Sequence, residues 1–155
     1  MSESVINPAA PQEAAPAAAQ AYVLFPLGKK RFALPAGKVT ELARPDRLQR
    51  FPHTTALLAG VLVRRGHIVP VLDVAQVLVG PNAPARKFYL IATRDFAGTS
   101  EWTAIPVTGE CELASAASLP ASGNPPHYVS GWLALKEEII EVVDLEKLAA
   151  GEAMP

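Results

Sequence analysis

The sequence has little that marks an enzyme, a disulfide-linked fold or a membrane protein. It has one cysteine, Cys111, which cannot staple the fold and is typical of a reducing compartment. Without cationic or metal-ligating neighbours, Cys111 is expected to be a packing or surface residue. No segment approaches the ~20 apolar residues of a transmembrane helix, and the N-terminus lacks the basic and apolar regions of a signal peptide. We therefore expect a cytoplasmic protein without direct membrane contact.

Catalytic and metal-binding motifs are also missing. His53, His67 and His127 are scattered, and none has a metal-ligand spacing with cysteine or carboxylate. The sequence contains no nucleophile elbow, phosphate-binding loop or dinucleotide fingerprint. Asp73 and Asp144 look like a carboxylate pair, but each lies where a strand passes into a helix, so helix capping explains both. No catalytic residue, cofactor or metal ligand is predicted, and the chain is not expected to be an enzyme.

The chain does contain ample material for a core. Of its 155 residues, 50% are hydrophobic and 19% are charged, which fits one domain or two very small subdomains that share a core. Residues 1–20 are rich in alanine and proline and almost lack large apolar groups, so we expect a disordered arm.

From residue 21 onward, short apolar segments alternate with turn residues, as in β-proteins. Turns are expected at Gly28 and at Arg65-Gly66, while Pro70 has no N–H to donate and indicates an edge strand or a bulge. The serine-containing segment ELASAASLPASG is interpreted as a loop. Strands are expected in AYVLFPL, KRFALPA, GVLVR, HIVPVLD, KFYLIAT, EWTAIPV, HYVSGWLAL and EIIEVVD, and short helices in VAQVL and LEKLAA.

The sequence repeats weakly at an offset of 71 residues. At this offset, glycine, aliphatic and aspartate residues of the first half align with equivalent residues of the second half without a gap. The alternative is a chance match between two sequences that are both rich in aliphatic residues. We favour internal symmetry, with subdomain 1 at approximately 21–80 and subdomain 2 at approximately 86–150. The matched residues are Ala33, Pro35, Glu41, Leu42, Ala43, Gly60, Leu62, Ile68, Val71 and Asp73 with Ala104, Pro106, Glu112, Leu113, Ala114, Gly131, Leu133, Ile139, Val142 and Asp144.

Charge is divided between the two halves, although the net charge is only -1. Residues 21–87 hold eleven Lys/Arg and three acids, about +8, and residues 88–155 hold three Lys/Arg and ten acids, about -7. This division is compatible with ordinary solvated surface. It is also compatible with halves that meet oppositely charged faces of another molecule, or that join copies head to tail.

Arg64 and Arg65 interrupt an apolar stretch beside a turn. There a guanidinium can fork onto a carboxylate or a backbone carbonyl of a partner, or it can be a solvated charge that prevents edge-to-edge aggregation. We favour the solvated interpretation for Arg64 and partner contact for Arg65. Small β-barrels offer grooves and edge strands that capture helices or extended peptides.

The segment GVLVRRGHIVPVLDV resembles the signature segment of the CheW-like family of bacterial chemotaxis coupling proteins. FPLGKKRFALPAGKVTEL is similar to the family's opening hairpin and Val-x-Glu element, and YVSGWLALKEEIIEVVDLEKL is similar to its closing strands and helix. The resemblance covers nearly all of 21–150. Val63 and Arg64 stand where the family usually has Asn and Leu, and AIPVTGECEL replaces a Val-Asp-x-Val segment.

The resemblance implies a mainly β fold of two intertwined SH3-like five-stranded barrels with short helices. It implies a non-catalytic scaffold that joins the cytoplasmic tip of methyl-accepting chemoreceptors to the regulatory domain of a chemotaxis-type histidine kinase. In this family the barrels meet the kinase domain end to end in rings, and a groove between the barrels takes the receptor tip. The protein would reach membrane receptor arrays only through these partners.

By position, Arg65 matches the family's motif arginine, Gly60 and Gly66 match its two glycines, and Glu41 matches its Val-x-Glu acid. We predict partner contact for Arg65 and Glu41, which could equally pair with each other, a backbone role for the glycines, and a contribution from Arg64. The alternative function is a stand-alone β-barrel that binds nucleic acid or another anionic ligand through the basic half.

Overall fold

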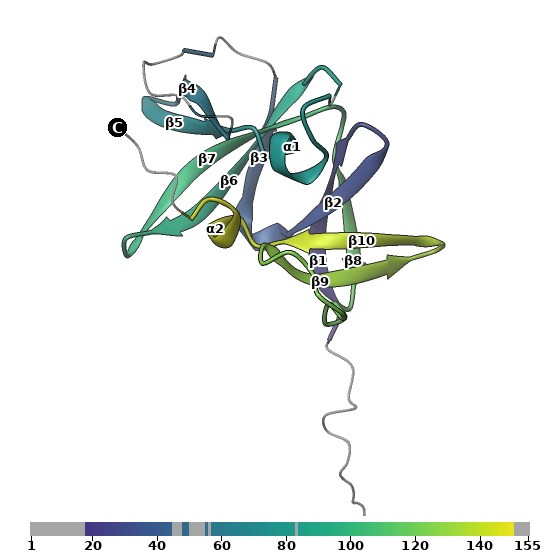
Figure 1. The fold of residues 1–155 in the computed structure, drawn as a ribbon. Helices are drawn as coiled ribbons and strands as arrows, with labels where there is room; N and C mark the ends of the chain where they lie inside the picture. The colour runs from purple at the N-terminus through teal and green to yellow at the C-terminus, as the bar shows by residue number, and fades with distance from the viewer. Residues whose placement is uncertain (1–17, 45–47, 50–54, 56, 83, 151–155) are drawn as a thin grey trace, which may run out of the picture.

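The computed structural model describes residues 18–44, 48–49, 55, 57–82 and 84–150. The predicted disordered arm, 1–20, therefore lies almost wholly outside the described residues. The described part is mainly β and forms two five-stranded sheets, as expected (Figure 1). Sheet 1 has the order β8 (Glu112–Ala116), β1 (Gln20–Leu27), β2 (Lys30–Pro35), β10 (Glu138–Val143), β9 (Val129–Leu135), and sheet 2 has the order β3 (Val39–Ala43), β6 (Phe88–Phe96), β7 (Thr99–Val107), β5 (His67–Leu72), β4 (Leu58–Arg64).

The internal repeat is real at the level of structure. β9 and β10 begin and end 71 residues after β4 and β5. Within the described residues there are three short helical turns, and the last two have equivalent places in the two repeats. They are η2 (Ala36–Lys38), α1 (Ala75–Leu78) and α2 (Leu145–Leu148).

The two sheets are not the two halves of the sequence. Sheet 1 takes β1 and β2 from the first repeat and β8–β10 from the second, while sheet 2 takes β6 and β7 from the second and β3–β5 from the first. Each repeat therefore contributes strands to both sheets, and neither sheet coincides with the predicted subdomain 21–80 or 86–150. This exchange joins the repeats through two parallel strand pairs, β2 with β10 and β5 with β7.

Each sheet curls so that its two edges approach one another. The segment after β3 returns to the far edge, where Gln49 exchanges two backbone hydrogen bonds of 2.8–2.9 Å with Val61 of β4. In sheet 1, Leu119 does the same with Trp132 of β9 at 2.8 Å. The sheets are therefore closed in the same way, as a pair of small barrels requires.

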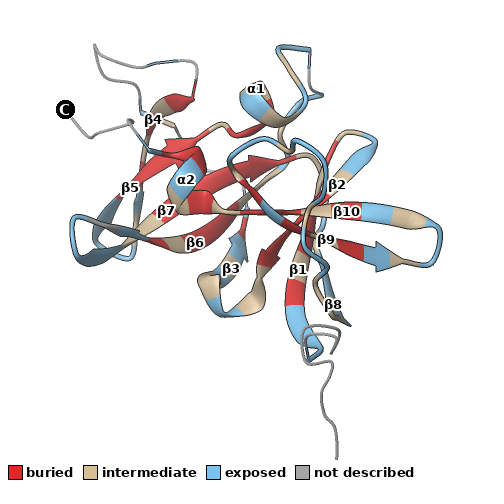
Figure 2. Ribbon diagram, turned by 60° about the horizontal axis from the view of Figure 1, so that its bottom comes forward, coloured by how far each residue is buried: buried red, intermediate tan, exposed pale blue. Residues whose placement is uncertain are grey.

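Three groups of buried side chains form the core. A central group is shared by both sheets and includes Phe25, Phe32, Leu72 and Leu145. Each sheet also encloses a smaller group, and Leu62, Val69 and Val71 of sheet 2 correspond in the repeat to Leu133, Ile140 and Val142 of sheet 1. Figure 2 shows the buried positions gathered where the sheets meet and the exposed ones toward the hairpin ends.

Two sequence-based interpretations of local structure need correction. ELASAASLPASG is not all loop, because its first five residues are the edge strand β8, which pairs with β1. Its small side chains have low strand propensity, and the pairing is non-local. Pro70 lies on β5, which is flanked by β7 and β4 and is not an edge strand. The pairing of β5 with β7 is short instead.

Candidate functional site

Most of the residues singled out from the sequence lie together at the β4–β5 hairpin of sheet 2. Glu41 on β3 and Arg64 on β4 lie on strands that are brought together by the curl of the sheet. Arg64 donates from Nε and an Nη to the two carboxylate oxygens of Glu41 at 3.0 and 2.7 Å. The hydrogen bonds from Arg64 hold the pKa of the Glu41 carboxyl below its usual range, against the opposing effect of burial.

Arg65 occupies the tip of the β4–β5 hairpin. Its φ is 52°, and Gly66 follows at 79°, so both residues of this two-residue turn are left-handed. The Arg65 side chain is 67% exposed and lies 3.4 Å from Glu41, whereas the Arg64 side chain is 28% exposed. The sequence-based division of roles is therefore wrong for Arg64, which is the residue that forks onto Glu41.

Gly60 lies near the other end of β4, four residues before Arg64, and its role is in the backbone. A Cβ on Gly60 would lie 2.5 Å from the carbonyl oxygen of Gln49. Glycine is needed here because the returning segment passes directly over it.

The equivalent end of sheet 1 carries a different ion-pair cluster. Arg31 on β2 contacts Glu112, the repeat counterpart of Glu41, and donates to Glu138 at 2.6 and 3.3 Å. These hydrogen bonds lower the pKa of the Glu138 carboxyl. Sequence reasoning missed Arg31 and Glu138, and the signal that could have found them was the match of Glu112 to Glu41 at 71 residues.

Exposed aliphatic side chains accompany both clusters. Leu42 and Ile68 are 37% and 67% exposed in sheet 2, and their repeat counterparts Leu113 and Ile139 are 73% and 59% exposed in sheet 1. The β4–β5 and β9–β10 hairpins lie on opposite sides of the molecule (Figure 1). The protein thus presents two related surfaces with different chemistry.

The two aspartates that were expected to cap helices behave differently. Asp144 accepts a hydrogen bond from the backbone N–H of Lys147 at 3.1 Å and caps α2 as predicted. Asp73 makes no capping bond to α1. It accepts two hydrogen bonds of 3.0 and 2.8 Å from Arg86, so it fastens the connection between the repeats.

The opposite charges of the two halves pair with each other at the surface of the molecule. Arg31 pairs with Glu112 and Glu138, and Lys38 pairs with Glu146 at 2.7 Å, so each of these ion pairs joins the basic half to the acidic half. Strand exchange therefore mixes the charges that the sequence separates. This weakens the hypothesis that the basic half forms a separate binding face.

Other candidate chemistry is sparse in the part of the chain that the structure describes. No group of three or more His, Cys, Asp or Glu could hold a metal ion among these residues. No helix among them is long and apolar enough to cross a membrane. Cys111 is half-buried against the central core, where burial raises the pKa of its thiol to about 11.

Comparisons with known proteins agree with one another. The model of the CheW-like domain family matches residues 21–153. "Chemotaxis protein CheW" of Klebsiella aerogenes is 25% identical over 142 residues, which are 87% of this chain and 84% of that protein. The crystal structure of scaffolding protein TtCheW from Thermoanaerobacter tengcongensis has a TM-score of 0.74 at 18% identity, with 96% of this chain and 97% of that chain covered.

Proposed function

The chain belongs to the CheW-like family, whose members are chemotaxis scaffold proteins, and from this premise we propose that it couples chemoreceptors to a chemotaxis-type histidine kinase. The observation that carries the proposal is the family match over residues 21–153, nearly the whole described chain. In this role the protein catalyses no reaction. It holds kinase and receptor in a fixed relation, so that a change in the receptor biases the kinase between active and inactive states.

The geometry supports a two-ended adaptor. Opposite hairpins each combine an arginine–glutamate cluster with exposed aliphatic side chains. Apolar contact supplies affinity, and the adjoining charges fix register and exclude wrong partners. We assign partner contact to Arg65 and Glu41, with Arg64 holding Glu41 in place and with Gly60 and Gly66 shaping the backbone.

The anionic-ligand alternative is not favoured. A basic module would need its cations on one continuous surface, but Arg31 and Lys38 are engaged by acidic residues of the second half.

Charge reversal at the hairpin tip tests the proposal. Arg65→Glu should abolish capture of the kinase regulatory domain or of the receptor tip, because it reverses the charge of the exposed guanidinium at the hairpin tip. Pull-downs would use a chemotaxis-type histidine kinase and a chemoreceptor from the same organism, and Tm would confirm folding. Lys87→Glu makes the same charge change on the exposed connection between the repeats and should leave capture intact. Unchanged capture of both partners by Arg65→Glu would remove Arg65 from the site, and failure of the unaltered protein to capture either partner would refute the coupling role.

A further inference from the structure

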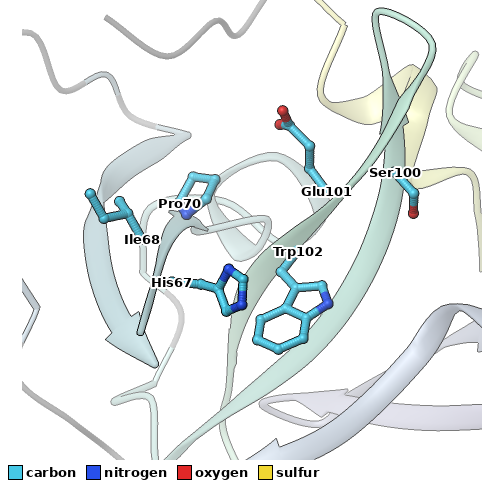
Figure 3. Close-up of a pocket in the computed structure, with 6 residues that line it drawn as sticks. All are labelled: His67, Ile68, Pro70, Ser100, Glu101 and Trp102. Atoms are coloured by element: carbon cyan, nitrogen blue, oxygen red, sulfur yellow. The ribbon is translucent and has the colours of Figure 1, made fainter. Parts of the chain in front are cut away.

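Two hollows of the molecule adjoin the hairpin surfaces already described. One, of about 500 Å³, lies between β5 and β7, and Figure 3 shows its lining residues, which include Ile68. The other, of about 550 Å³, lies in sheet 1 and is lined in part by Arg31, Glu112 and Glu138. Both hollows therefore belong to the surfaces that we assign to partner coupling.

A third groove lies between the tip of the β1–β2 hairpin and the connection between the repeats, and we call it the lysine groove. It has a volume of about 370 Å³. Leu27 in its lining is buried, whereas Val79 is 38% exposed, so the groove leaves apolar surface open to water. The lining comes from Leu27, Gly28, Lys29 and Lys30 on one side and from Val79 and Pro84 on the other, and none of these residues belongs to either hairpin surface.

Both walls of the lysine groove are held in place. The hydroxyl of Thr108 accepts a hydrogen bond of 2.8 Å from the N–H of Gly28, which fixes the tip of the hairpin. Arg86 donates to the carbonyl oxygen of Pro84 at 2.6 Å, which fixes the connection. A Cβ on Gly28 would lie only 3.1 Å from Cδ of Pro84, so the two walls are in close contact at this point. The groove is therefore formed in advance, and a ligand does not have to order it.

The hairpin carries three consecutive cations, and they differ in their partners. Arg31 is paired with Glu112 and Glu138. Lys30 points to the opposite face of β2, as the neighbouring residue of a strand does, and its ammonium lies 5.3 Å from the centre of the Phe32 ring. Within the described residues, neither Lys29 nor Lys30 forms an ion pair with a carboxylate.

The fold does not require this pair of lysines. Both side chains are exposed, and their repeat counterparts at an offset of 71 residues are Ser100 and Glu101. The same position of the strand is therefore filled by a carboxylate in the other sheet. Two unpaired ammonium groups beside an apolar groove are suited to recognise negative charge next to an aliphatic group.

We propose that the lysine groove binds an acidic segment of a partner protein through one aliphatic side chain of that segment. The aliphatic side chain packs against Leu27, Val79 and Pro84 and removes their apolar surface from water. Carboxylates on either side of it meet the ammonium groups of Lys29 and Lys30. The site is additional to the two hairpin surfaces, so it does not rest on the proposed coupling role.

An acidic protein segment fits the groove better than a nucleic acid does. Single-stranded nucleic acids bind proteins by stacking their bases on aromatic side chains, and no aromatic residue is found among the described residues that line this groove. A phosphate backbone held by Lys29 and Lys30 would leave the surface of Val79 in water. An aliphatic side chain covers that surface.

Binding of a defined peptide to the purified full chain tests the proposal. The probe is the capped heptapeptide EEELEEE, whose affinity is measured by fluorescence anisotropy and whose site is located by amide chemical shifts of the isotope-labelled chain. We expect saturable binding that weakens with salt, with the largest shifts at Lys29, Lys30 and Val79. The peptides EEESEEE, without the aliphatic side chain, and KKKLKKK, with reversed charge, should bind at least tenfold more weakly.

Matched variants separate the lysine groove from general effects. Lys29→Glu should weaken binding about tenfold, because attraction becomes repulsion, and Val79→Ala should weaken it about threefold, because aliphatic surface is lost. The controls are Lys147→Glu, at an exposed lysine on α2, and Val77→Ala, at a valine on α1 that is 44% exposed and lies outside the groove. Both controls should bind the peptide as the unaltered protein does, and Tm would confirm that all four variants fold.

Several results would overturn the proposal. They are no binding up to about 1 mM peptide, equal binding of EEESEEE or KKKLKKK, and a loss for Lys147→Glu as large as that for Lys29→Glu. Tighter binding of octathymidylate at the same residues would make the groove a nucleic-acid site. Amide shifts at these residues that grow with protein concentration alone would make its occupant a second copy of this chain, and either outcome also refutes binding of an acidic partner segment.

Discussion

At the scale of the residue, backbone conformation decides which of two adjacent arginines is structural. Arg64 is the last residue of β4 and, like buried Leu62, belongs to the inward-facing set of its strand, so its side chain reaches Glu41. Arg65 is turned outward by its left-handed φ of 52°. Sequence reasoning could find the pair and the acid that they share. Sequence reasoning could not say which arginine faces inward, because the pairing of β4 with β5 decides which side chains of β4 face the core.

Removing the charge of Glu41 tests the structural half of this pair. Because the pKa of Glu41 is lowered on folding, its ionised form stabilises the protein above its unfolded pKa, and this contribution is lost as pH falls through the folded value. We expect Glu41→Gln to lower the free energy of unfolding by about 1 kcal/mol at pH 7. The deficit should shrink at low pH, as protonation of Glu41 removes its charge from the unaltered protein as well. Urea unfolding at both pH values measures it, and the exposed Glu137→Gln is the control. An equal deficit at both pH values would argue against the ion pair.

Cys111 should react slowly with thiol reagents. Burial raises its pKa to about 11, so little thiolate exists near pH 8. We expect labelling by a disulfide reagent to be much slower in the native protein than in urea, with a native rate that keeps increasing up to pH 10. A fast native reaction that levels off below pH 9 would contradict the buried environment.

At the scale of the element, equivalent glycines, Gly60 and Gly131, let a returning segment pass over the edge strand of each sheet. A Cβ at Gly131 would lie 2.8 Å from the carbonyl oxygen of Leu119, much as one at Gly60 would meet Gln49. The repeat in the sequence aligned these two glycines, and the apolar and turn pattern predicted β4, β5, β9 and β10. It did not reveal β8, whose small residues form a strand only because β1 lies beside them.

Alanine at either closing glycine should loosen its sheet. We expect Gly60→Ala and Gly131→Ala each to lower the free energy of unfolding by about 1–3 kcal/mol, since the added methyl must displace backbone. Gly37→Ala is the control, because a Cβ added at Gly37 would have no neighbouring atom within 4 Å. Chemical denaturation gives the comparison, and a Gly60→Ala protein as stable as Gly37→Ala would show that the returning segment does not press on β4.

At the scale of the whole molecule, the fold is an exchange of strands between two repeats. Local sequence predicts where strands begin and end, but it does not say which strands pair. Here each sheet needs both repeats, and the ion pairs of Arg31 and Lys38 with the second half favour the exchanged arrangement. The charge division of the sequence therefore has a physical use within the molecule, because opposite charges bring the repeats into register.

Strand exchange predicts that the chain can be cut between its repeats without coming apart. A protease site inserted after Gly80, between Asp73 and Arg86, should be cleavable in the native protein, and the Asp73–Arg86 pair would then join the two pieces. The two pieces should then elute together, since the central core and both sheets take residues from each repeat. High salt should weaken their association, because the joining ion pairs are screened. Each piece expressed alone should be unfolded by circular dichroism. Pieces that separate without denaturant and remain folded would mean that the repeats are autonomous, and the exchanged topology would be wrong.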